Sequence, residues 1–137
     1  MTTSILLVDD NRTFLRILIR FLSEHSEGAL RVVGTVVGGR DAVAQAKRLN
    51  PQVILVDLAM PDISGLALIP RLREAMPDAI IIALTLMDPD SFHQATLTAG
   101  ADAFVSKTSL ERDLLPTIKR LAALESRMGR AVSAAVH

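Results

Sequence analysis

The stretch Val53–Asp57 reads VILVD, an apolar run with mostly branched side chains that ends on an acid. Comparable runs recur along the chain at a nearly constant interval, at Ser4–Val8, Leu30–Val36, Val53–Val56, Ala79–Leu84 and Ala103–Ser106. The runs are mostly continuous rather than alternating, which is typical of strands covered on both faces, as in a parallel sheet. The sequence therefore predicts five buried strands.

Between these runs lie segments with helical periodicity, in which apolar residues are spaced by three and four. The apolar positions are Phe14, Leu15, Ile17, Leu18, Phe21 and Leu22, then Ala42, Val43, Ala46 and Leu49, then Leu66, Ile69, Leu72 and Met76, and finally Leu114, Ile118, Leu121 and Leu124. A further helix is expected to open at Pro89 and to close at Gly100. Strand followed by helix, five times, predicts an α/β, flavodoxin-like doubly wound (βα)5 fold with the parallel sheet order 2-1-3-4-5.

The last helix carries an irregularity. Pro116 falls within its apolar stripe, where a proline removes a hydrogen bond and costs about 3 kcal/mol. We therefore expect this helix either to start late, near Asp113, or to be kinked at the proline. Residues 1–126 are expected to form the domain, and residues 127–137 to extend the last helix or to begin a linker.

The composition excludes several classes of protein. Fifteen basic residues balance fifteen acidic ones, which argues against a chain that coats nucleic acid or an anionic membrane. Cysteine is absent, so neither a disulfide nor a thiolate metal site can form. No apolar run approaches the roughly 20 residues that cross a bilayer, and no signal peptide is evident. We expect a cytoplasmic protein.

Polar residues terminate four of the predicted strands. Asp9 and Asp10 follow the first strand, Asp57 ends the third, Thr85 ends the fourth and Lys107 follows the fifth. In the predicted topology these positions share one edge of the sheet, where such folds bind ligands. Three converging carboxylates repel one another unless a cation lies among them, and Mg²⁺ prefers oxygen ligands while leaving positions for phosphate. A carboxylate can also act as the nucleophile toward phosphorus and form an aspartyl-phosphate.

Each of these residues also has a purely structural interpretation. The acids after the first strand, or Asn11, would cap the first helix. Asp57 would cap a turn, Thr85 would be an ordinary strand residue, and Lys107 would be a solvated surface charge. Their joint occurrence at the ends of four separate strands favours the chemical interpretation.

Several motifs match a known family at these strand ends. They are Ile5–Asn11, Pro51–Pro61 with Gly65, Ala83–Thr85 and Gly100–Lys107. Through them the chain resembles, over nearly its whole length, the receiver domains of bacterial two-component response regulators. The run of motifs is most similar to the receivers of LuxR/NarL-type regulators, which carry a helix-turn-helix domain after the receiver.

The resemblance implies a phosphoacceptor signalling domain rather than an enzyme in the ordinary sense. Asp57 would be the phospho-acceptor, and a sensor histidine kinase would be the donor. Asp9, Asp10 and Asp57 would hold Mg²⁺, with the backbone carbonyl of Ala59 as a further ligand. The domain itself would bind neither nucleic acid nor membrane.

The resemblance also implies a switch that controls an output domain or partner, with transcription as the expected output and a homodimer as one possibility. Lys107 would pair with the phosphorylated aspartate, and Thr85 would be the switch hydroxyl. Phe104 stands where the family has an aromatic residue that turns inward. Ordinary packing of Phe104 against the fourth helix is an equally good interpretation.

Three neighbours of the site depart from the commonest pattern of the family. Leu86 is larger than the residue often found after the switch hydroxyl and would narrow access to the acyl phosphate. The apolar side chains of Ala59 and Met87 cannot orient an attacking water by hydrogen bonding. We therefore predict a comparatively long-lived phosphoryl group.

Other functions fit less well. A haloacid-dehalogenase-type phosphatase needs a second acid two residues after its nucleophile, and that position is Ala59. A nucleotide-binding βαβ protein needs glycine in the first βα turn, which has none, and Gly38-Gly39 lacks the lysine of a P-loop. A phosphorylation-independent pseudo-receiver would have lost an acid or the lysine, and all of these are present. It ranks second.

Overall fold

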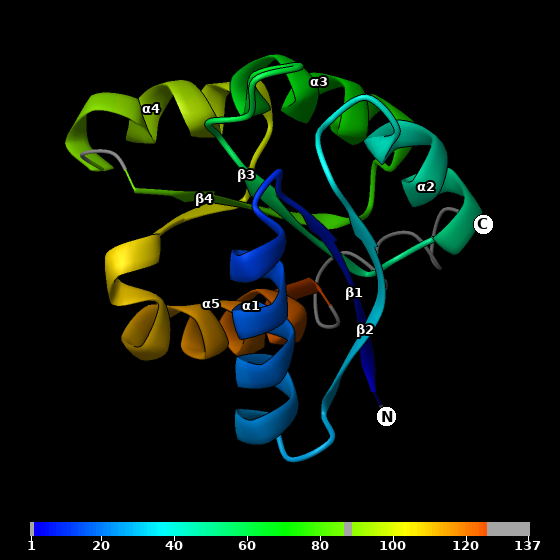
Figure 1. The fold of residues 1–137 in the computed structure, drawn as a ribbon, viewed down its shortest axis with the longest axis vertical. Helices are drawn as coiled ribbons and strands as arrows, with labels where there is room; N and C mark the ends of the chain where they lie inside the picture. Colours follow the sequence, from blue (N-terminus) through cyan, green and yellow to red (C-terminus); the bar gives the residue numbers. More distant parts are fainter. Residues whose placement is uncertain (1, 87–88, 126–137) are drawn as a thin grey trace.

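The computed structural model describes residues 2–86 and 89–125. A five-stranded parallel sheet with the order β2-β1-β3-β4-β5 forms its centre (Figure 1), so the predicted topology is confirmed. The strands are β1 (Thr3–Val8), β2 (Leu30–Val36), β3 (Val53–Asp57), β4 (Ile80–Thr85) and β5 (Ala103–Ser106). They lie within one residue of the five apolar runs.

Helices cover both faces of the sheet. They are α1 (Arg12–His25), α2 (Ala42–Leu49), α3 (Gly65–Ala75), α4 (Pro89–Ala99) and α5 (Leu110–Leu124), with a short 3-10 helix, η1 (Lys107–Ser109), before α5. Figure 1 shows α1 and α5 on one face and α2, α3 and α4 on the other. Over the described residues, no helix is long and apolar enough to span a membrane.

The core consists of two apolar layers, one on each face of the sheet. Alternate residues of a strand serve opposite layers: Leu7 and Leu55 pack toward α1 and α5, while Leu6 and Ile54 pack toward α2 and α3. Every residue of β3 is buried. This two-sided burial is why the strands read as continuous apolar runs rather than as alternating ones.

The helix ends follow local chemistry. The Asn11 side chain caps α1 by accepting the Phe14 N–H at 3.0 Å, and Asn50 closes α2 in the left-handed conformation. The fourth helix runs from Pro89 to Ala99, and Gly100 follows at φ 121°, as predicted. Ile17 and Leu124, which the predicted apolar stripes include, are 58% and 55% exposed, so these two residues do not belong to the buried faces of their helices.

The fifth helix does not start late. It begins at Leu110 and continues through Pro116, which lacks the N–H that would bond one turn back. Leu110 and Leu114 lie before the proline and Ile118 lies after it, and all three are buried against the sheet. Their burial holds both halves of the helix in place and outweighs the cost of the proline. A kink at Pro116 stays a prediction.

One buried hydroxyl in α4 is left without a partner among the described residues. Thr96 is fully buried, and its Oγ1 makes no hydrogen bond. Thr96→Val keeps the shape of the side chain and removes this unsatisfied group, so we expect it to raise the free energy of unfolding by about 1 kcal/mol. Urea denaturation measures the change, and Thr98→Val, at an exposed hydroxyl of the same helix, is the control. A destabilised Thr96→Val variant would contradict this expectation.

Candidate functional site

The sheet brings the strand-end residues together at its carboxyl edge. Val8 of β1 pairs with Val56 of β3, so the residues that follow them, Asp9 and Asp57, are neighbours. Thr85 ends β4 and pairs with Ser106, the residue before Lys107. Parallel pairing alone therefore places residues from four strands within one site.

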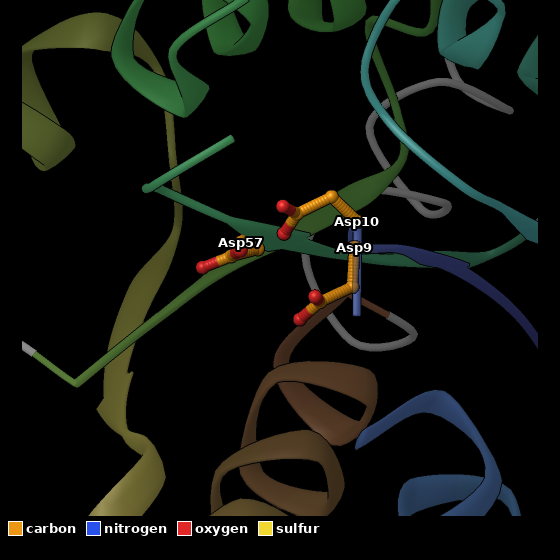
Figure 2. A group of neighbouring side chains, drawn as sticks. All are labelled: Asp9, Asp10 and Asp57. Atoms are coloured by element: carbon orange, nitrogen blue, oxygen red, sulfur yellow. The ribbon is translucent and has the colours of Figure 1, made fainter. Parts of the chain in front are cut away.

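Three carboxylates form the centre of this site. One carboxylate oxygen from each of Asp9, Asp10 and Asp57 lies within 4.8 Å of the others. Figure 2 shows the three side chains turned toward one shared space at the strand ends. Asp9 and Asp57 are buried, with 2% and 5% exposure, whereas Asp10 is exposed. An all-oxygen donor set of this charge, open to solvent on one side, fits a hard divalent cation such as Mg²⁺.

Lys107 bridges two of the acids. Its Nζ lies 2.8 Å from Asp9 Oδ2 and 3.4 Å from Asp57 Oδ1, and its side chain is only 9% exposed. One ammonium against three carboxylates leaves the site with an excess of negative charge. That excess favours the binding of a further cation.

The electrostatics of Asp57 suit a nucleophile. Its burial, and the nearby Asp9 carboxylate, raise the pKa of Asp57 above the usual value. The Lys107 ammonium and the Ala59 N–H, which donates to Asp57 Oδ1 at 3.3 Å, oppose this rise only in part. A more basic carboxylate donates its electrons more readily, and Lys107 keeps it oriented.

The remaining predicted residues lie around this centre. Thr85 is fully buried at the end of β4, and Leu86 beside it is 73% exposed. Phe104 is partly buried and packs against the apolar layer on the α2 and α3 face. Phe104 thus makes ordinary packing contacts with this layer. Its expected packing against the fourth helix in particular, and its role as a switch, stay predictions. Met87 lies outside the described residues.

The sequence left open whether the residues after β1 cap α1 or belong to the acidic site. The structure gives these two roles to different residues. Asn11, not an acid, caps α1. Asp9 belongs to the acidic site, and its Oδ1 accepts the Asn11 N–H at 2.9 Å while its Oδ2 faces Lys107. Phe14, whose ring lies under the Lys107 ammonium, was predicted as an apolar helix position but not as a residue of the site. Its position in the first turn of the helix after the two acids was the available signal.

Gly38 and Gly39, which follow β2, lie in a turn. Gly38 adopts φ 91°, and the N–H groups of Gly39 and Arg40 donate to the Asp62 carboxylate at 3.0–3.1 Å. These hydrogen bonds lower the pKa of Asp62. They tie the loop after β2 to the loop after β3, and so help to hold the rim of the acidic site.

A doubly wound sheet with three acids and a lysine at its carboxyl edge is the arrangement of a phosphoacceptor signalling domain. A family model described as "Response regulator receiver domain" matches residues 5–119. The chain belongs to this family, as the resemblance implied.

Proteins similar to this chain include response regulators and an isolated receiver domain. The chain is 30% identical over 126 residues to the response regulator protein VraR of Staphylococcus aureus, which covers 92% of this chain and 59% of that protein. A solved LuxR-family response regulator from Aurantimonas sp. SI85-9A1 is 26% identical, with a TM-score of 0.82 over 90% of this chain and 86% of that one. The beryllofluoride-activated receiver domain of DrrB is 28% identical, with a TM-score of 0.76 over 90% and 99%. The predicted likeness to LuxR/NarL-type receivers is confirmed.

Proposed function

We propose that this chain accepts a phosphoryl group on Asp57 from a sensor histidine kinase in the cytoplasm, in a Mg²⁺-dependent reaction. One observation carries the proposal: a buried carboxylate at the end of β3 lies against a second carboxylate and against an ammonium. Such a group has both the basicity to attack phosphorus and a nearby cation to offset the charge that develops.

The transfer releases a neutral imidazole, so the donor ring must already carry a proton on its other nitrogen or take one up from solvent as the bond to phosphorus breaks. An Asp57 carboxylate oxygen forms a bond to phosphorus, and the bond from phosphorus to the donor's imidazole nitrogen breaks with its electron pair remaining on nitrogen. Mg²⁺ held by Asp9, Asp10 and Asp57, with the carbonyl of Ala59 as a further ligand, would supply positive charge to the phosphoryl oxygens. The Lys107 ammonium, already 3.4 Å from Asp57 Oδ1, stabilises the same charge.

Phosphorylation then acts by population shift. Phosphate on Asp57 recruits the hydroxyl of Thr85 and the ammonium of Lys107, and this favours the active arrangement of the face formed by α4, β5 and α5. Phe104 on β5 would turn inward in that state. The chain spans 59% of the length of the VraR sequences it matches. The activated face would act on an output domain or a partner. We propose that this output is transcription and that a homodimer forms on activation.

We also propose the division of the chain that the sequence predicted. Residues 1–126 would be the receiver, in agreement with the match over residues 5–119. The predicted helix extension or linker at 127–137 lies outside the described residues.

Labelling tests the acceptor directly. Wild-type protein incubated with Mg²⁺ and acetyl phosphate is expected to gain one phosphoryl group, detected by intact-protein mass spectrometry, and Asp57→Asn is expected to gain none. Asp78→Asn, at an exposed acid before β4, is the matched control and should label normally. Incorporation that survives Asp57→Asn would refute the site. A wild-type protein that never labels would favour the pseudo-receiver.

The long-lived phosphoryl group is a second consequence of the proposed site. Ala59 is exposed beside Asp57, and its methyl group offers no hydrogen bond to an incoming water. Leu86, the residue after Thr85, is also exposed and would narrow access to the acyl phosphate. Ala59→Asn introduces a polar group at this position, and we expect it to shorten the half-life of phospho-Asp57. Loss of label after removal of the donor measures the half-life. A wild-type half-life of seconds would contradict the prediction.

A further inference from the structure

We propose that Phe14 is a positioning residue for phosphoryl transfer, because its ring holds the Lys107 ammonium between the two buried carboxylates. The inference rests on the proposed function and adds to it a residue that belongs to neither the acidic cluster nor the switch. Its central observation is a cation–π contact, with Lys107 Nζ 4.1 Å from the centroid of the Phe14 ring.

The surroundings of the ammonium show why the ring matters. The Lys107 side chain is 9% exposed, so little water remains to solvate its charge. Asp9 and Asp57 satisfy part of the ammonium's demand for partners, at 2.8 and 3.4 Å. The negative face of an aromatic ring attracts a cation, and this attraction grows when water is excluded. An aliphatic residue of similar size would fill the space without supplying that attraction.

Asn11 contacts both the Asp9 carboxylate and the helix turn that carries the Phe14 ring. Asn11 donates its backbone N–H to Asp9 Oδ1 at 2.9 Å, and its side chain accepts the Phe14 N–H at 3.0 Å. Phe14 also packs against the apolar layer under α1. The two groups that contact the ammonium from the β1–α1 side are therefore held in a fixed relation to each other.

This arrangement suits an ammonium that must shift during the reaction. In the unphosphorylated structure Lys107 Nζ is closer to Asp9 than to Asp57. When Asp57 gains a phosphoryl group, new anionic oxygens appear on its side. As the ammonium leaves its 2.8 Å contact with Asp9, the ring face supplies a larger share of the attraction that holds it, because a ring face is less directional than a hydrogen bond to one oxygen. The Phe14 ring can thus retain Lys107 while the ammonium moves from Asp9 toward the phosphoryl oxygens.

The test replaces Phe14 with phenylalanines carrying one, two and three fluorine atoms. Fluorine withdraws electrons from the ring face in steps but changes its shape little, so it weakens the cation–π contact without deleting the side chain. We measure the rate of Asp57 phosphorylation by acetyl phosphate at saturating Mg²⁺, together with the melting temperature. In this reaction the Asp57 oxygen–phosphorus bond forms, and acetate leaves with the electron pair of the broken bond.

We expect the logarithm of the rate to fall steadily with fluorination, while the melting temperature stays nearly constant. Phe14→Leu should slow the reaction by about three- to tenfold, the loss expected for one partly desolvated cation–π contact. The same fluorinated series at Phe21 is the control, because Phe21 is buried on the same helix but stacks on His25. There the rate should not change.

The possible results separate this inference from the proposed function. A slow Phe14→Leu variant combined with a flat fluorinated series would reduce Phe14 to packing and overturn the inference, as would the absence of any slowing. In either case labelling confined to Asp57 would leave the proposed function intact. Phosphoryl incorporation into Asp57→Asn would instead refute the acceptor itself.

Discussion

Gly65→Ala is expected to destabilise the protein by about 3 kcal/mol and to slow phosphoryl acceptance at Asp57. A Cβ at residue 65 would lie 2.5 Å from the carbonyl oxygen of Asp57 and 2.6 Å from the Cα of Leu58. Both are backbone atoms, so no side-chain rotation relieves the clash. Because the Gly65 N–H also donates to the Leu58 carbonyl at 3.0 Å, α3 can move away only by giving up that bond.

Gly28→Ala separates this clash from the general effect of replacing a glycine. Gly28 has φ +78° and open space around its Cβ position, so alanine there costs only backbone strain, about 1–2 kcal/mol. Urea denaturation gives the two free energies of unfolding, and acetyl phosphate labelling gives the two rates. We expect Gly28→Ala to label at the wild-type rate. Equal costs at the two positions, or normal labelling of Gly65→Ala, would show that the β3–α3 connection tolerates a shift.

The topology could be predicted because local and global preferences agree along the strands. Burial on both faces forces runs such as Val53–Val56 to be continuously apolar, and the βα alternation then leaves few ways to arrange the sheet. The acids at the ends of these runs must meet at one edge. For this reason the strand-end residues of the site could be identified from their positions alone.

What the sequence did not reveal depends on tertiary packing. A proline argues against a helix interior, yet Pro116 lies inside α5, because buried neighbours such as Leu114 and Ile118 hold this helix on the sheet. The contact between Phe14 and Lys107 joins distant parts of the chain. The apolar stripe does not show that the Phe14 ring faces a cation, and its place in the first turn after the two acids is the one hint that the sequence offers.

Lys107→Met is expected to lower the free energy of unfolding by about 3 kcal/mol at neutral pH in the presence of a metal chelator. The lysine bridges Asp9 and Asp57, whose side chains are 3% and 6% exposed, and methionine fills similar space without charge. Its loss leaves two buried carboxylates facing each other without the cation that separates them. Lys119→Met, at an exposed lysine of α5, should change the stability by less than about 0.5 kcal/mol.

The pH dependence distinguishes lost charge from lost packing. The pKa of Asp57 is raised in the folded wild-type protein. Protonated Asp57 therefore contributes to the free energy of unfolding below the unfolded-state pKa, and this contribution is lost as pH rises through the folded-state pKa. The Lys107 ammonium is one of the causes that limit this rise. Without it the folded-state pKa moves higher, and the stability lost on ionising Asp57 increases.

The deficit of Lys107→Met relative to wild type should therefore be small in acid, where Asp57 is protonated, and should grow toward neutral pH. Urea denaturation across that range measures it. Adding Mg²⁺ at neutral pH should recover part of the loss, because a divalent cation bound by Asp9, Asp10 and Asp57 separates the same charges. A deficit that is independent of both pH and Mg²⁺ would mean that Lys107 acts by packing alone. The electrostatic account of the site would then be wrong.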